Sequence, residues 1–190
     1  MKKSIALVMM AVLLVAASVM GTLAYLTSTA TVTNTFTVGK VAITLDEAEV
    51  TEYGEAVTPA SRVKENTYKL IPGHAYTKDP TVHFAAGSEA SWLFVKVENG
   101  IAAIEADTTI ADQITTNGWA ALTGVDGVYY KQVDANNTAA AIDYPVFETF
   151  KLDGEADVSK YANAAVKVTA YAIQADGFTT PDAAWAKFSN

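Results

Sequence analysis

The chain has 190 residues and no cysteine, and its 21 acidic and 13 basic side chains give a formal net charge of -8 at pH 7. This charge repels nucleic acid and anionic lipid, and the lack of cysteine excludes a disulfide scaffold and a catalytic thiol. Stability must come from a hydrophobic core, for which hydrophobic residues at 51% of the chain suffice.

Residues 1–24 are typical of an export signal. Two lysines precede an apolar run from Ile5 to Met20, which is slightly shorter than a membrane-spanning helix. We expect a signal peptidase to cleave between Ala24 and Tyr25, although an uncleaved anchor helix is the alternative. Cleavage leaves a secreted protein with 11 basic and 21 acidic residues, for which we expect neither membrane nor nucleic-acid partners.

Residues 25–40 include an N-terminal strand that we consider a candidate assembly element. Threonines alternate with mostly apolar residues, which is typical of a strand. The strand comprises Thr29, Ala30, Thr31, Val32, Thr33, Asn34, Thr35, Phe36, Thr37 and Val38. It is uncharged and free of proline, so it lacks the usual protection against pairing with an open sheet edge. It pairs either within its own domain or with another molecule.

Residues 41–190 are typical of one β-sandwich domain. Apolar and polar side chains alternate in short segments, as expected for strands with one buried face. We expect strands over residues 41–46, 81–85, 92–98, 142–152 and 166–174, with 92–98 at the centre of a sheet.

Turn and capping signals divide these strands. Val125-Asp126-Gly127-Val128 predicts a hairpin with a type I′ turn. Thr109 and Asp112 predict a capping box on a short helix over 109–116, and Thr180 followed by Pro181 predicts a second short helix. Because no long helices separate the strands, we expect an all-β fold: an antiparallel β-sandwich with one or two short helices, preceded by a signal-peptide helix.

Several motifs resemble the TasA/camelysin-like family of exported proteins, which the SipW type of signal peptidase cleaves. The motifs are Gly21-Thr22-Leu23-Ala24-Tyr25-Leu26, Asn34-Thr35-Phe36-Thr37-Val38-Gly39-Lys40-Val41, Ile71-Pro72-Gly73, Lys78-Asp79-Pro80-Thr81-Val82 and Trp92-Leu93-Phe94-Val95-Lys96-Val97. The resemblance implies a jelly-roll-like sandwich outside a Gram-positive cell. It also implies extracellular fibres of a biofilm matrix, in which the N-terminal strand of one subunit completes the sheet of the next.

Camelysin-like proteins have been classed as metallopeptidases, an activity that would require zinc ligands. The sequence has no His-Glu-x-x-His motif and only two histidines, His74 and His83. These could meet Asp79 around an ion, but we interpret both as solvated side chains. The acidic runs at 46–49 and 153–157 are surface charge or weak calcium sites. We therefore assign no catalytic residue, no metal ligand and no cofactor.

Exposed aromatic residues would support a different function, the binding of surface polysaccharide. The candidates are Trp92, Trp119, Tyr129 and Tyr130, most of which are better explained as core residues. Our leading hypothesis is therefore a non-enzymatic structural protein of the cell surface or matrix. Its expected partners are the signal peptidase during export, and then other copies of itself or other matrix proteins.

Overall fold

The structure is a computed structural model that describes residues 9–10 and 39–189. The cleavage site at Ala24 and Tyr25 and the strand Thr29–Val38 lie outside the described residues. From Gly39 onward the chain forms a compact unit of its own. None of the helices that the structure describes is long and apolar enough to cross a membrane.

The described part of this unit consists mainly of strands. They are β1 (Ile43–Ala48), β2 (Arg62–Val63), β3 (Ala75–Thr77), β4 (Thr81–Phe84), β5 (Ser91–Asn99), β6 (Ala120–Ala121), β7 (Val128–Val133), β8 (Ile142–Pro145), β9 (Thr149–Lys151) and β10 (Val166–Gln174). The helices are short: α2 (Ile110–Thr116), α3 (Pro181–Trp185) and the 3-10 turns η1 (Ala102–Ile104) and η2 (Val158–Tyr161). This confirms the prediction of an all-β protein with antiparallel strands and two short helices.

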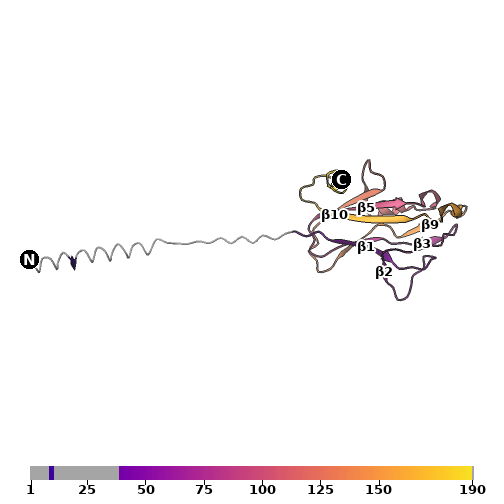
Figure 1. Cartoon of the computed structure of the whole chain (residues 1–190), viewed down its shortest axis with the longest axis horizontal. Coiled ribbons are helices and arrows are strands. Elements are labelled where there is room, and N and C mark those ends of the chain that lie inside the picture. The colour runs from indigo at the N-terminus through magenta and orange to yellow at the C-terminus, as the bar shows by residue number, and fades with distance from the viewer. Residues whose placement is uncertain (1–8, 11–38, 190) are drawn as a thin grey trace, which may run out of the picture. The chain divides into compact units, whose positions relative to one another are not determined.

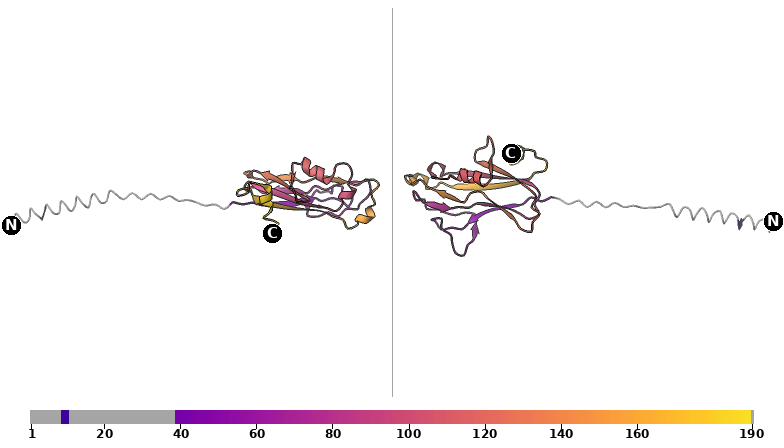
Figure 2. Two further views of the ribbon diagram at one scale, coloured as in Figure 1. Left: turned by 90° about the horizontal axis from the view of Figure 1, so that it is seen from above. Right: turned by 180° about the vertical axis from the view of Figure 1, so that it is seen from behind.

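The strands form two four-stranded sheets and one small sheet. The first sheet has the order β2-β1-β4-β8, the second has the order β10-β5-β7-β6, and β3 pairs with β9. Each strand pair within these sheets is antiparallel. The β5–β10 pair lies on one side of the domain and β1 and β2 lie on the other, in two layers (Figures 1 and 2). As predicted, β5 is a central strand, flanked by β10 and β7.

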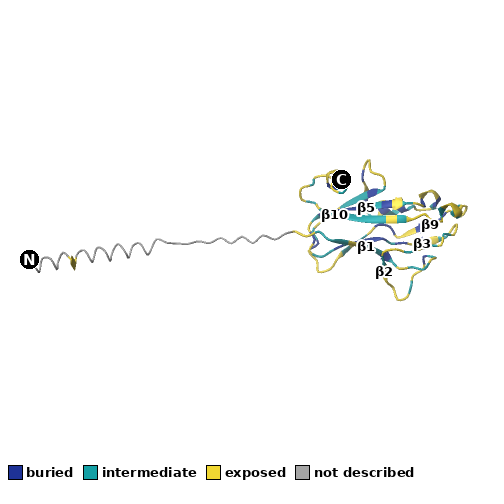
Figure 3. Ribbon diagram, viewed as in Figure 1, coloured by how far each residue is buried: buried dark blue, intermediate teal, exposed yellow. Residues whose placement is uncertain are grey.

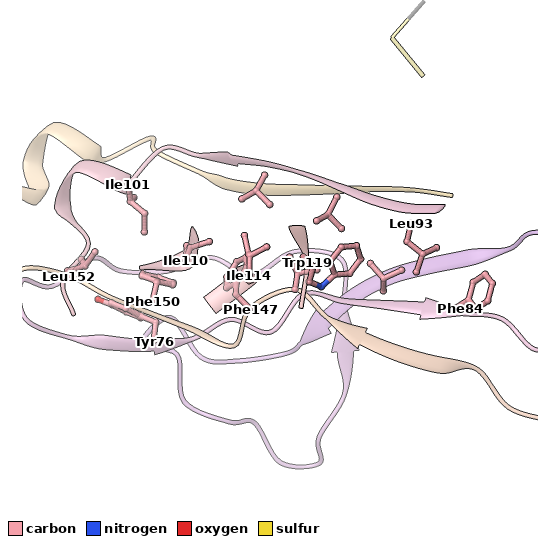
Figure 4. Close-up of a cluster of buried hydrophobic side chains, with 14 of the residues drawn as sticks. Tyr76, Phe84, Leu93, Ile101, Ile110, Ile114, Trp119, Phe147, Phe150 and Leu152 are labelled. Carbon is pink, nitrogen blue, oxygen red and sulfur yellow. The ribbon is translucent and has the colours of Figure 1, made fainter. Parts of the chain in front are cut away.

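The core lies between the two large sheets. Phe84 from the first sheet and Leu93 from the second are both fully buried in one cluster (Figure 4). The same cluster includes Trp119, whose indole N–H donates to the carbonyl oxygen of Pro145 at 2.9 Å. The buried amide of Asn136 donates to the carbonyl oxygen of Phe84 at 2.9 Å. The apolar side chains and the satisfied polar groups together hold the sheets in register.

A second hydrophobic cluster covers the outer face of β5. Trp92 and Phe94 point into it, whereas Leu93, Val95 and Val97 point into the main core. The C-terminal segment closes it, because Trp185 lies 5.3 Å from Phe94 between ring centroids. This arrangement explains why the sequence of β5 is apolar on both faces.

Local signals predicted both helices correctly. The Thr109 side chain accepts the N–H of Asp112, whose carboxylate accepts the N–H of Thr109, so the capping box is present. The hydroxyl of Thr180 accepts the N–H of Ala183, and Pro181 occupies the first helical turn. These bonds satisfy backbone groups that a helix start leaves free.

Two details of the sequence prediction are wrong. The expected strand over 142–152 is split into β8 and β9, which belong to different sheets, because buried Val146 and Phe147 carry the chain between them. The hairpin between β6 and β7 is present, but its turn is not type I′. Gly127 has a φ of 69°, whereas Asp126 does not have a positive φ, and a type I′ turn needs both.

Truncation of the link between β8 and β9 tests the shared core. Phe147 is fully buried, so Phe147→Ala should lower the free energy of unfolding by about 3–5 kcal/mol. Val125→Ala is the control. Because Val125 is exposed, this substitution should change the free energy of unfolding by less than about 0.5 kcal/mol. Urea denaturation monitored by tryptophan fluorescence measures both. Equal effects would contradict the assignment of Phe147 to the core.

Candidate functional site

The second edge of β10 is the most unusual surface of the domain. β10 pairs with β5 over all nine of its residues, yet no described strand pairs with its other side. The strand is long, and Lys167 is its only charged residue. Native edge strands of this length usually carry charge, proline or a bulge that prevents pairing with another chain. Among the described residues, nothing therefore prevents a further strand from pairing with this edge of β10.

The side chains of β10 indicate that this edge is incompletely covered. Val166, Val168, Ala170 and Ala172 pack against the main core but are only partly buried. The neighbouring strand β5 is almost entirely buried, and the contrast is visible along β10 (Figure 3). On the opposite face, Tyr171 is covered by the C-terminal Trp185 and Phe188. Thr169, Tyr171 and Ile173 on that face are nevertheless only partly buried, so neither face of β10 is fully covered by the described residues.

A groove with a volume of about 850 Å³ runs beside the start of β10. Val166 and Val168 form one side of it, and Leu45 of β1 forms the other. Its apolar lining includes Leu70, Ile101, Phe150, Val158 and Tyr161. The groove combines an unpaired strand edge with room for large apolar side chains, the two features that peptide recognition by strand addition requires.

One wall of this groove is polar, and an ion pair and hydrogen bonds hold its side chains in place. Glu47 and Lys78 form an ion pair at 2.5 Å, and their side chains are only 6% and 10% exposed. Asn66 donates to the other carboxylate oxygen of Glu47 at 3.0 Å. The hydroxyl of Tyr68 donates to the carbonyl oxygen of Thr77, and burial raises the pKa of Tyr68 far above its ordinary value. These groups are already paired, so the wall provides shape and polarity.

A row of charged side chains crosses the first sheet. Asp46 lies between Arg62 and His83, and the Nε2 atom of His83 is 2.8 Å from Asp46. The Nδ1 atom of His83 is 2.6 Å from Asp143. Carboxylates accept hydrogen bonds, so two such partners favour the doubly protonated ring. Burial lowers the pKa of His83, but the two aspartates outweigh it and the net shift is upward.

The structure does not bring the two histidines together. His74 follows the Pro72-Gly73 turn and its Nε2 atom lies 2.9 Å from the carbonyl oxygen of Tyr53, whereas His83 lies between Asp46 and Asp143. Both rings are only partly exposed, so their interpretation as solvated side chains is wrong. Because the two carboxylates approach opposite edges of the His83 ring, they cannot converge on one ion, and no group among the described residues is arranged to hold a metal.

Within each acidic run, the carboxylates bind different partners. In the run at 46–49, Asp46 pairs with Arg62, Glu47 pairs with Lys78, and Glu49 accepts from Ser61. In the run at 153–157, Asp153 accepts the N–H of Glu155, and Asp157 accepts the hydroxyl of Ser159. A calcium site needs several oxygens directed at one point, which this arrangement does not provide.

The aromatic candidates for a sugar platform are largely core residues. Trp92 and Trp119 are 6% and 1% exposed, and both indole N–H groups donate to backbone carbonyls. Tyr129 and Tyr130 lie on β7 and are partly buried. No flat row of exposed rings results from these four side chains.

Comparisons with family models, with curated proteins and with solved structures found no match to this chain. The functional argument therefore depends on the residues and their geometry.

The sequence predicted β10 as a strand but not as an open edge. Strand order depends on contacts between distant segments, which alternation within one strand does not report. One local signal was present: residues 166–174 contain a single charge and no proline. The expected assembly strand, Thr29–Val38, lies outside the described residues, so its pairing stays a prediction.

The charged row should make stability depend on pH. The pKa of His83 is raised above 6.5. Its contribution to the stability of the folded domain is therefore complete below pH 6.5 and is lost as the pH rises through the pKa of His83 in the folded state. Burial raises the pKa of Asp46, but Arg62 and His83 lower it below 3.8, so that contribution is lost as the pH falls. The row should therefore stabilise the domain most between pH 3.8 and 6.5.

Urea denaturation at a series of pH values measures this effect. His83→Gln should remove most of the loss of stability seen above pH 6.5, whereas His74→Gln leaves the aspartates around His83 in place and should retain it. An unchanged pH profile in His83→Gln would show that another group is responsible.

Breaking the buried pair should destabilise the groove wall. Lys78→Met leaves the Glu47 carboxylate buried without its counter-ion, so we expect a loss of about 3–5 kcal/mol in the free energy of unfolding. The exposed pair of Lys167 and Glu98 is the control, and Lys167→Met should cost less than about 1 kcal/mol. Adding Glu47→Leu to Lys78→Met should restore most of the lost stability. If it does not, the unpaired Glu47 carboxylate is not the cause of the loss.

Proposed function

We propose that this protein is a secreted structural subunit of the cell surface or biofilm matrix, which assembles into fibres by donating its N-terminal strand to a neighbouring copy. The proposed architecture of the domain is a jelly-roll-like β-sandwich. The observation that carries the proposal is the unpaired nine-residue edge of β10, with its half-buried apolar face beside a groove. A strand on this edge would satisfy backbone groups and cover apolar surface together.

Thr29–Val38 has the properties of a suitable occupant. It is ten residues long, uncharged and rich in β-forming residues, and it alternates a threonine face with a face of Ala30, Val32, Asn34, Phe36 and Val38. The mostly apolar face would turn toward the half-buried side chains of β10, and the threonines would face outward. The sequence of this segment therefore resembles that of β10 in length, polarity and periodicity.

The export signal supports an extracellular role. The charged, apolar and small-residue regions of residues 1–24 occur in the order that a signal peptidase reads, and cleavage after Ala24 would place Thr29–Val38 close to the new N-terminus. A strand near a chain end is free to enter a neighbouring molecule. The partners are then the signal peptidase during export and other copies of this chain afterwards.

Removal of the donor strand tests the proposal. The secreted protein starting at Tyr25 should form filaments as its concentration rises, whereas a variant lacking Thr29–Val38 should stay monomeric. Sedimentation velocity and negative-stain electron microscopy over a concentration series measure this. Replacement of the ten residues by a glycine-serine linker of equal length should also abolish assembly, because the linker keeps the spacing without the β-propensity. Filaments of the deletion variant would contradict strand donation.

A further inference from the structure

Three side chains in the polar wall of the groove are arranged for a covalent reaction that the proposed function does not use. We infer that Lys78 and Asn66 join in an intramolecular isopeptide bond, formed by attack of the lysine amine on the asparagine carboxamide, with Glu47 as the proton carrier. The bond does not depend on assembly, because all three residues lie in the described domain.

One carboxylate holds both reacting groups. The Nζ atom of Lys78 lies 2.5 Å from one oxygen of Glu47, and the Nδ2 atom of Asn66 donates to the other oxygen at 3.0 Å. Lys78 and Glu47 are buried, and Asn66 is partly buried. The amine, the amide and a group that can carry protons are therefore held together away from water, which raises the effective concentration of the amine beside the amide.

Backbone groups fix the orientation of the Asn66 carboxamide. The N–H of Val50 donates to its Oδ1 atom at 3.0 Å, and its Nδ2 atom also donates to the carbonyl oxygen of Ala48 at 2.8 Å. A backbone N–H can only donate and a carbonyl oxygen can only accept, so the amide nitrogen is the end that faces Glu47. The N–H of Val50 also stabilises the negative charge that develops on Oδ1 when an amine attacks the carboxamide.

The reaction exchanges one amide for another. Glu47 takes a proton from the Lys78 ammonium, which leaves two neutral groups where burial penalises charge. The amine then attacks the Cγ atom of Asn66 and forms the new C–N bond. Glu47 gives its proton to Nδ2, the old C–N bond breaks, and the surplus proton of the new amide leaves with the ammonia. In sum, an ammonium group and a carboxamide give a secondary amide and an ammonium ion, with no oxidation and no co-reactant.

The surroundings protect the reacting groups and give the product an exit. The ring centroid of Tyr68 lies 5.8 Å from the Nζ atom of Lys78 and covers it on one side. Lys78, Asn66 and Glu47 all line the groove, through which ammonia can reach solvent. The other lysines that form ion pairs in the described part of the chain pair with carboxylates that bind no asparagine side chain, so the arrangement is specific to this wall.

The bond braces a part of the domain that has little regular structure. Asn66 lies between β2 and β3, and Lys78 lies between β3 and β4, so the bond closes a ring over residues 66–78. A cross-link of this kind lowers the entropy of the unfolded chain, as a disulfide does. The chain contains no cysteine, and an amide bond needs no oxidant and resists reduction.

The intact mass of the purified protein tests the bond. Electrospray mass spectrometry of the denatured, unsubstituted chain should give a mass that is lower than the sequence mass by one ammonia molecule. Asn66→Ala and Lys78→Met each remove one reacting group, so both should have the full mass. Lys64→Met is the control: Lys64 also lines the groove but donates to the carbonyl oxygen of Leu45, and this variant should keep the mass deficit.

Trypsin digestion locates the bond. Trypsin cleaves after Lys69, which lies between the two joined residues, but not after a lysine whose amine is part of an amide. The digest should therefore contain a branched product, in which peptide 65–69 is attached through Asn66 to peptide 70–96 at Lys78. Loss of ammonia by ring closure at Asn66 alone would leave Lys78 open to cleavage and would give no branched product.

The role of Glu47 has its own readout, which is the rate of the reaction. Glu47→Gln keeps the size of the side chain but cannot carry the proton, so the mass deficit should develop about 10²–10⁴-fold more slowly. An unchanged rate in Glu47→Gln would overturn the role of Glu47. Circular dichroism checks that this variant is folded.

The first measurement is made on the unsubstituted chain, so it does not depend on whether a variant folds. A full sequence mass in the folded protein would overturn the bond, as would a deficit that persists in Asn66→Ala or Lys78→Met. Neither result changes with filament formation, which tests the proposed function separately. When the bond is present, Asn66→Ala is the reference for the denaturation of Lys78→Met, because it keeps the ion pair of Glu47 and Lys78 without the bond.

Discussion

Backbone hydrogen bonding at the edge of β10 is the constraint on which the rest of this structure depends. A strand in the interior of a sheet satisfies its N–H and C=O groups on both sides, whereas β10 is paired with β5 on one side only. The side chains on its inner face are consequently half-buried, and the groove beside Val166 persists because no described segment covers it. The absence of a described strand beside β10 therefore accounts for both its unpaired backbone groups and its partly exposed apolar side chains.

The other elements can be understood as supports for that edge. The C-terminal segment packs on the outer face of β5 and β10, where Trp185 contacts Phe94 and Phe188 contacts Tyr171. The buried pair of Glu47 and Lys78 fixes the polar wall of the groove. The row from Arg62 through His83 to Asp143 links four strands of the first sheet, so the position of β1 opposite β10 is maintained by charge as well as by core packing.

Local features of the fold could be predicted from the sequence, and long-range features could not. Alternation placed β1, β4, β5 and β10, and capping chemistry placed both helices, because these depend on neighbouring residues. The split between β8 and β9 was missed because their aromatic and β-branched composition is continuous across Val146 and Phe147. The charged row was missed for another reason: Asp46, His83 and Asp143 are far apart in sequence and meet only through the strand order.

The position of the C-terminal helix has a practical consequence. α3 rests on the outer face of the second sheet, where Trp185 covers Phe94 and Tyr171, whereas the groove opens on the inner side of β10. A fluorescent label on the C-terminal segment would therefore lie on the opposite face of the sheet from the groove, and ligand binding in the groove could be followed without blocking it.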